Sequence, residues 1–172
     1  ENVAREQVAR LRDAHHLTNA AVVVLEPSTG EILAMVGSID FNDESIDGQV
    51  NVTIAARQPG SAMKPFTYAS ALEKGMSPAQ VIWDPETQIG MPGQEPYIPH
   101  NYDNTFHGPV RVREALANSY NIPAVQTLRQ VGVEYLLWMM NCVGVTSLSS
   151  DPSLYGLSLT LALLLALLSA LV

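Results

Sequence analysis

The sequence predicts a mixed α/β (α+β) fold in which helices cover both faces of a sheet, a helix–sheet–helix sandwich. Three observations predict it: two short apolar runs around a turn, helical periodicity on either side of them, and a length sufficient for a core. The chain has 172 residues, of which 47% are hydrophobic, so it can bury a core without disulfides or structural metal. Its single cysteine, Cys142, excludes an internal disulfide framework.

The first part of the chain predicts a helix and then a hairpin. Residues 2–14 place Val3, Val8 and Leu11 near helical spacing, which indicates an amphipathic helix. The apolar runs 20–26 and 31–37 flank a Pro-Ser-Thr-Gly turn and predict a β-hairpin. Because both runs are apolar at nearly every position, we expect both faces of this sheet to be covered.

The rest of the chain predicts loops and short helices. Residues 38–58 are polar and lack periodicity, which indicates a loop, and residues 61–74 predict a helix that Gly75 ends. Residues 84–109 are rich in Pro and Gly and predict a long extended surface segment without a helix. Residues 111–143 predict two or three short helices, interrupted at Pro123 and Gly132.

The charge and the metal-ligand types exclude some functions. The formal net charge is −8, from nine basic and 17 acidic residues, which argues against a nucleic-acid partner because phosphate binding needs a basic face. Four His and one Cys leave little for a zinc site. We therefore expect no metal and no cofactor.

Ser61 and Lys64 are the first candidates for chemistry. Residues three apart on a helix share a face, so the Lys64 amine would come within reach of the Ser61 oxygen. A serine hydroxyl becomes a good nucleophile when a base takes its proton, and a lysine can be that base if burial keeps it neutral. The alternative is that Ser61 is only the N-cap of its helix.

Ser119 and Asn121 are the second candidates. A hydroxyl and a carboxamide two residues apart project together where the backbone turns, and Pro123 favours a break between helices at this point. In such a break the hydroxyl can pass on a proton, and the amide can donate to a substrate carbonyl. The alternative is that Ser119 or Asn121 caps the following helix.

Together these motifs resemble the transpeptidase domain of class A penicillin-binding proteins. The ten residues 57–66 (RQPGSAMKPF) resemble its nucleophile segment, and residues 115–124 (ALANSYNIPA) resemble its second motif. Residues 25–37, 101–103, 107–110 and 155–159 are similar to other segments of the same domain. The resemblance extends from about residue 18 to about residue 161 and implies the fold of penicillin-binding proteins and serine β-lactamases.

The resemblance implies a role for each candidate. Ser61 would attack the carbonyl between two terminal D-alanines of a peptidoglycan stem peptide, and Lys64 would act as its base. Ser119 would pass the proton to the leaving D-alanine, Asn121 would hold the substrate, and the Ser61 backbone N–H would donate to the oxyanion. A β-lactam would acylate Ser61 in place of the donor peptide. The expected location is the extracytoplasmic face of the bacterial membrane, reached through an upstream anchor outside this chain.

One motif of the family is missing from this sequence. The family has a Lys-Thr/Ser-Gly motif downstream, whereas no lysine follows Lys74 here. We therefore expect an incomplete domain, the amino-terminal part of one transpeptidase, which is inactive or nearly so alone. Its expected divisions are a lead-in helix at 1–17, a family-like part at 18–161 and an atypical Leu/Ala tail at 162–172.

Three weaker signals in the sequence also have structural explanations. Residues 154–172 carry no charge and are about long enough to span a bilayer, with a buried core helix or an altered stretch of sequence as alternatives. His100, Asp103 and His107 could suggest a metal site, although bonds within the loop fit better. Three aromatic residues of that loop could line a cleft, although packing onto the domain fits better: Tyr97, Tyr102 and Phe106.

Two other functions remain open at this point. The segment from Glu134 to Leu137 has the Glu-x-x-Leu pattern of class A β-lactamases, in which a glutamate activates the deacylating water, but it fits an amphipathic helix with Leu137 and Trp138 buried. A serine β-lactamase or β-lactam sensor is therefore one alternative to a transpeptidase. A degenerate domain without catalysis, with a binding or membrane role, is the other.

Overall fold

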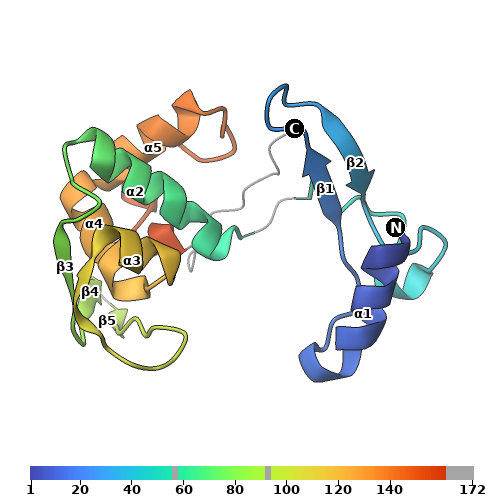
Figure 1. Cartoon of the computed structure of the whole chain (residues 1–172), viewed down its shortest axis with the longest axis horizontal. Helices are drawn as coiled ribbons and strands as arrows, with labels where there is room; N and C mark the ends of the chain where they lie inside the picture. Colours follow the sequence, from blue (N-terminus) through green and yellow to red (C-terminus); the bar gives the residue numbers. More distant parts are fainter. Residues whose placement is uncertain (56–57, 92–93, 162–172) are drawn as a thin grey trace. The chain divides into compact units, whose positions relative to one another are not determined.

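The computed structural model describes residues 1–55, 58–91 and 94–161. The contacts among them divide the chain into two compact units, residues 1–55 and the described residues from 58 onward. Figure 1 shows the helices and strands of each unit. The mixture of helices and small sheets confirms the predicted α/β class.

The amino-terminal unit consists of a helix and a hairpin. Helix α1 (Asn2–His15) packs its buried Val8 against Ile39, and Arg5 donates a hydrogen bond of 2.9 Å to the Ile39 carbonyl. Strands β1 (Val22–Leu25) and β2 (Ile32–Val36) pair antiparallel. A short 3₁₀ helix, η1 (Glu44–Ile46), lies in the following loop. The predicted helix and hairpin are confirmed.

The hairpin is less buried than the sequence predicts. Every side chain of β1 is exposed, from 40% at Val22 to 53% at Leu25. Among residues 1–55, no helix or strand therefore covers both faces of this small sheet. The apolar composition of the strands predicts that their side chains need to be covered. It does not identify the element that covers them.

The second unit is mainly helical. Helix α2 (Lys64–Glu73) contacts both α4 (Asn121–Val131) and α5 (Val133–Cys142), and η4 (Leu157–Leu161) packs against α4. The buried core between them includes Met63, Leu128, Leu136, Met140 and Leu159. The helices of this unit are η2 (Gly60–Met63), α2 (Lys64–Glu73), α3 (Val112–Ala117), α4 (Asn121–Val131), α5 (Val133–Cys142), η3 (Pro152–Leu154) and η4 (Leu157–Leu161).

A strand pair closes the Pro- and Gly-rich segment at its two ends. Strand β3 (Val81–Asp84) pairs antiparallel with β6 (Gly108–Arg111), with Asp84 opposite Gly108. Strands β4 (Ile89–Met91) and β5 (Gln94–Tyr97) pair within the segment. The prediction of extended structure without a helix is confirmed for the described residues. The register places His107 beside Asp84.

The breaks between helices are partly as predicted. Gly132 separates α4 from α5 with a φ of 88°, a conformation that glycine adopts readily. The other break lies at residues 118–120, so the prediction of an interruption at Pro123 is wrong. Pro123 lies in the first turn of α4, where a missing N–H costs little because that N–H has no partner within the helix.

Candidate active site

Ser61 and Lys64 lie at a junction between two kinds of helix. Ser61 belongs to the 3₁₀ helix η2 and is exposed, whereas Lys64 is the first residue of α2. Neither η2 nor α2 has a side-chain cap hydrogen bond, and their N-caps are Pro59 and Met63. The structure therefore does not support the alternative that Ser61 is a helix N-cap.

The Lys64 side chain is buried and surrounded by oxygen atoms of the second motif. The residue is 1% exposed, and its amine donates to Asn121 Oδ1 at 2.6 Å, to Ser119 Oγ at 3.0 Å and to the Ser119 carbonyl. Among the hydrogen bonds of the described residues, none joins Lys64 to the Ser61 hydroxyl. The structure thus brings Lys64, Ser119 and Asn121 together. The fourth predicted site residue, Ser61, lies three positions before Lys64 in the chain.

These contacts suit both protonation states of the amine. An ammonium group has three N–H donors, which match the three oxygens. A neutral amine has two N–H groups and one lone pair, so it can donate to the carbonyl and amide oxygens and accept from the Ser119 hydroxyl. Burial lowers the pKa of Lys64 to about 8, because desolvation disfavours the charged form. The site can therefore hold a lysine that acts as a base near neutral pH.

Ser119 has an unusual backbone conformation with a clear cause. Its φ is 56°, in the left-handed region that residues other than glycine seldom adopt. The Ser119 N–H donates to Leu116 O and the Tyr120 N–H donates to Ala115 O, both at 3.0 Å. This pair of bonds is a Schellman motif at the end of α3, with Ser119 at the position that glycine usually occupies. The turn directs the serine hydroxyl to Lys64.

Asn121 is fixed at three atoms. It is the first residue of α4; its Oδ1 accepts from Lys64, and its Nδ2 donates to the carbonyl of His100. Its backbone N–H donates to Asn101 Oδ1 at 2.7 Å. The N-cap of α4 is Tyr120, without a side-chain cap bond, so neither Ser119 nor Asn121 caps this helix with its side chain. The prediction that a hydroxyl and an amide project together is confirmed.

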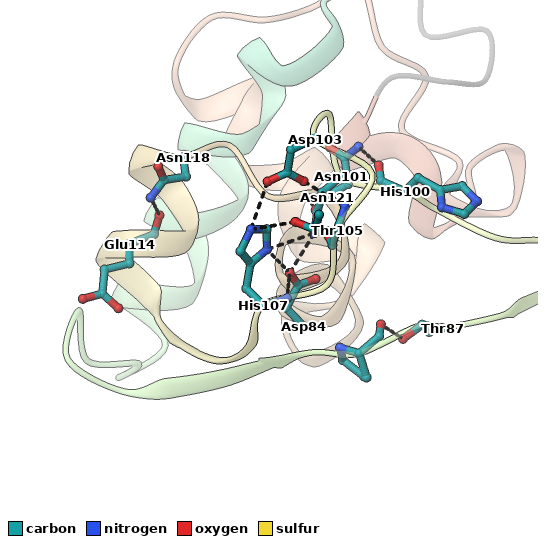
Figure 2. Close-up of polar contacts among 11 residues, drawn as sticks. Asp84, Thr87, His100, Asn101, Asp103, Thr105, His107, Glu114, Asn118 and Asn121 are labelled. Atoms are coloured by element: carbon teal, nitrogen blue, oxygen red, sulfur yellow. Dashed lines mark hydrogen bonds and ion pairs between the residues drawn. The ribbon is translucent and has the colours of Figure 1, made fainter.

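A buried polar network lies next to Asn121 and was not predicted from the sequence (Figure 2). Asp84 is fully buried, and its Oδ2 accepts from Asn101 Nδ2 at 2.7 Å and from the His107 N–H at 3.0 Å. His107 Nδ1 lies 2.8 Å from the same Oδ2, and its Nε2 lies 3.0 Å from Asp103 Oδ2. Hydrogen bonding to Asp84 raises the pKa of His107.

The sequence held part of the signal for this network. From the sequence, His100, Asp103 and His107 are predicted to make hydrogen bonds within their loop. The structure confirms this for Asp103 and His107, which contact each other. Within the described ranges, no group of three or more His, Cys, Asp or Glu residues could hold a metal ion. Asp84 lies 23 residues before its partner His107. Only the β3–β6 register, which local patterns do not specify, predicts that these two meet.

Two predictions of buried aromatic residues are wrong. Trp138 lies on α5 with 51% of its surface exposed, although Leu136 and Leu137 beside it are buried. Its ring packs at a centroid distance of 5.1 Å on Tyr135, at the surface. Tyr102 is fully exposed, so it does not pack onto the domain, and Phe106 is also exposed. The Tyr97 side chain lies outside the described part of the structure.

The apolar end of the chain is described only as far as residue 161. Helix η4 buries Leu159 and Leu161, and Thr160 exchanges a buried hydrogen bond of 2.8 Å with Thr67. None of the helices in the described ranges has the length and apolar character that a bilayer crossing requires. The predicted Leu/Ala tail at 162–172 lies outside the described residues.

Comparisons with known proteins show the family to which this chain belongs. Residues 20–153 match the family described as the penicillin binding protein transpeptidase domain. The chain is 35% identical to penicillin-binding protein 1C of Escherichia coli over 145 residues, which cover 84% of this chain and 18% of that protein. The chain thus spans less than a fifth of this relative's length.

Solved structures lead to the same family. The chain resembles penicillin-binding protein 1A of Haemophilus influenzae with a TM-score of 0.69 and 31% identity, covering 88% of this chain and 21% of the other. It shares the fold of the penicillin G acyl-enzyme complex of penicillin-binding protein A from M. tuberculosis, with a TM-score of 0.69 and 22% identity, covering 96% of this chain and 46% of the other. The chain therefore belongs to the transpeptidase family of penicillin-binding proteins, of the class A kind.

Proposed function

We propose that this chain supplies the nucleophile and proton-transfer groups of a penicillin-sensitive D,D-transpeptidase that acts through a Ser61 acyl-enzyme. One observation carries the proposal: the Lys64 amine is buried, has a pKa lowered to about 8, and is bonded to Ser119 and Asn121. A group with such a pKa, three residues from a serine, is a suitable general base at neutral pH.

The proposed reaction has two acyl transfers. The Ser61 oxygen attacks the carbonyl carbon between two D-alanines while its proton passes to Lys64. The tetrahedral intermediate collapses as the C–N bond breaks, and a proton passes from Lys64 through the Ser119 hydroxyl to the leaving amine. The amine of a second stem peptide then attacks the ester carbonyl and gives up a proton through Ser119 to Lys64. As the C–O bond to Ser61 breaks, Lys64 returns this proton to the Ser61 oxygen, which forms the cross-link and frees Ser61. Asn121 holds the donor peptide through its amide.

The proposed partners follow from the same chemistry. A β-lactam would acylate Ser61 because its strained amide takes the place of the donor peptide bond. The acyl-enzyme complex of penicillin-binding protein A with penicillin G supports this partner. Stem peptides lie outside the cytoplasmic membrane, so we place the active site on its outer face. The chain has no lysine beyond Lys74, and we propose that residues 1–172 alone have little activity.

Covalent labelling of the full-length gene product tests this function. Fluorescent penicillin should label one site, and the substitution Ser61→Ala should abolish labelling without changing the melting temperature. Ser77→Ala, at an exposed serine near the end of α2, is the matched control and should label normally. Normal labelling of Ser61→Ala would overturn the proposal.

The lifetime of the adduct separates a transpeptidase from a β-lactamase. We expect the penicilloyl group to stay on Ser61 for many minutes, because nothing in the proposed mechanism activates a water for its hydrolysis. Release within seconds would instead support the β-lactamase alternative. Mass spectrometry of the intact protein after removal of free penicillin measures this lifetime.

A further inference from the structure

Asn101 connects the buried network to the candidate active site. It is 2% exposed and uses both ends of its amide. Nδ2 donates to Asp84 Oδ2 at 2.7 Å and to the Thr105 carbonyl at 2.8 Å. Oδ1 accepts from the backbone N–H of Asn121 at 2.7 Å. Figure 2 draws Asn101 together with Asp84, Thr105 and Asn121.

The partners of Asn101 allow only one orientation of its amide. Asp84 Oδ2 also accepts from the His107 N–H, so it is an acceptor, as is the Thr105 carbonyl, whereas a backbone N–H only donates. Nδ2 must therefore face Asp84 and Thr105, and Oδ1 must face Asn121. A rotated amide would place Nδ2 against the Asn121 N–H and Oδ1 against the Asp84 and Thr105 oxygens inside the protein, where unpaired polar groups are costly.

Asp84 is a firm anchor for this amide. It ends strand β3 and is completely buried. The two His107 contacts to Oδ2 tie it to the start of β6. The His107 ring also stacks on Tyr120, at a centroid distance of 3.9 Å and an angle of 19°. Tyr120 lies between Ser119 and Asn121, so the network holds the second motif at its middle as well as at its end.

Two adjacent residues of the loop hold Asn121 by different groups. The Asn101 side chain holds its backbone N–H, and the His100 carbonyl accepts from its Nδ2. The second contact leaves Oδ1 of Asn121 to face Lys64. The loop from Asp84 to His107 therefore determines which atom of Asn121 the lysine meets.

We propose that Asn101, anchored by Asp84, is a positioning residue that aligns Asn121 and, through it, the Lys64 amine. The expected effect of Asn101 on catalysis rests on the proposed function. The geometric role does not, because the alignment of Lys64 is measurable without any substrate. A purely structural role, in which Asn101 only stabilises the first turn of α4, predicts instead that the Lys64 pKa does not change when Asn101 is replaced.

The first experiment measures the pKa of Lys64 directly. Labelling the full-length gene product with ¹³C-lysine gives its lysine side-chain signals, and comparison with Lys64→Arg identifies the signal of Lys64. Asn101→Ala keeps every charge of the network, and water admitted beside Lys64 would raise its pKa, so a fall in the Lys64 pKa indicates lost hydrogen bonds. Loss of the Asn121 oxygen as an acceptor disfavours the ammonium form, so we expect the pKa to fall by about half a unit or more.

The second experiment measures acylation in the full-length gene product. For Asn101→Ala, the second-order rate of labelling by penicillin should fall by about tenfold or more, since small misplacements of catalytic groups have effects of this size. The midpoint of the pH–rate profile should move to lower pH, together with the Lys64 pKa. Loss of folded protein alone would lower the labelled fraction without moving the midpoint.

Asp103→Asn is the matched control. Asp103 and Asp84 are both carboxylates on the His107 ring, but only Asp84 contacts Asn101. Asp103→Asn should therefore leave the Lys64 pKa and the acylation rate unchanged. Asp84→Asn keeps the shape of the side chain and serves as the second test variant if Asn101→Ala does not fold. It should lower the Lys64 pKa, whereas Asp103→Asn, which removes the same charge, should not.

The outcomes separate the two proposals. A lowered Lys64 pKa in Asn101→Ala or Asp84→Asn, without a change in Asp103→Asn, supports the positioning role. An unchanged Lys64 pKa in a folded Asn101→Ala protein overturns it, whatever the acylation rate. If penicillin does not label the wild-type full-length protein but the Lys64 pKa still falls in Asn101→Ala, the proposed function is wrong and the alignment of Lys64 by Asn101 stands.

Discussion

The amine nitrogen of Lys64 lies 3.0 Å from the hydroxyl oxygen of Ser119, although the two residues are 55 positions apart in the chain. Helix α2 supplies the lysine, and the turn between α3 and α4 supplies the serine. This contact allows a proton to move between the two side chains without a change in the backbone.

The pH dependence of acylation should follow Lys64. Its pKa is lowered from the usual value to about 8, and only the neutral amine can accept the Ser61 proton. The rate of β-lactam acylation by the full-length gene product should therefore rise about tenfold per pH unit below 8 and level off above it. Stopped-flow labelling between pH 6 and 9 measures this profile, and a flat profile would contradict the assignment of Lys64 as base.

Ser119→Gly should separate backbone strain from chemistry. Glycine adopts the left-handed conformation of residue 119 without the penalty that Cβ imposes. Ser119→Gly should therefore be more stable than Ser119→Ala, with a free energy of unfolding about 1 kcal/mol larger. Both variants lack the hydroxyl, but only Ser119→Ala keeps the backbone strain. Both should acylate roughly 10²-fold or more slowly than wild type. Denaturant unfolding and penicillin labelling provide the two measurements, and equal stability of the two variants would argue against strain at this position.

His107 should make the stability of the chain depend on pH. Its hydrogen bond to Asp84 and its proximity to Asp103 raise its pKa in the folded state, so the protonated ring stabilises the fold. This contribution is fully present below the unfolded pKa of about 6.5 and is lost as the pH rises through the raised folded value. The difference in unfolding free energy between wild type and His107→Gln should thus be larger at pH 5.5 than at pH 8.5. A difference that grows with pH would reverse the assignment.

The helical core of the second unit should respond strongly to truncation. Leu136 is fully buried and packs with Met63, Leu128 and Met140. Leu136→Ala should lower the unfolding free energy by about 2–5 kcal/mol, because it removes apolar contacts and leaves a cavity. Val143→Ala, at an exposed position just after α5, should change it by less than about 0.5 kcal/mol. Chemical denaturation of both variants tests the pair, and a small effect at Leu136 would place it outside the core.

Local patterns predicted the elements better than their burial. The helix at 2–14 and the hairpin at 20–37 follow from periodicity and turn residues, and both are present. The exposed side chains of Trp138 and Tyr102 were predicted incorrectly. A large aromatic residue favours burial on average, but whether another element lies over it is a property of packing.

The sequence by itself determined which residues can carry chemistry. Ser61 and Lys64 are three positions apart at the start of a helix, and Ser119 and Asn121 are two apart at a break, so each pair is set by local geometry. Tertiary structure decided how the pairs meet. Lys64 donates hydrogen bonds to Ser119 and Asn121, whereas no hydrogen bond joins it to Ser61 among the described residues. It also decided that Asp84, through Asn101, supports Asn121. Bonds between residues 17 to 57 positions apart depend on the β3–β6 register and on the packing of α2 against α4, because short-range spacing does not constrain distances between separate elements.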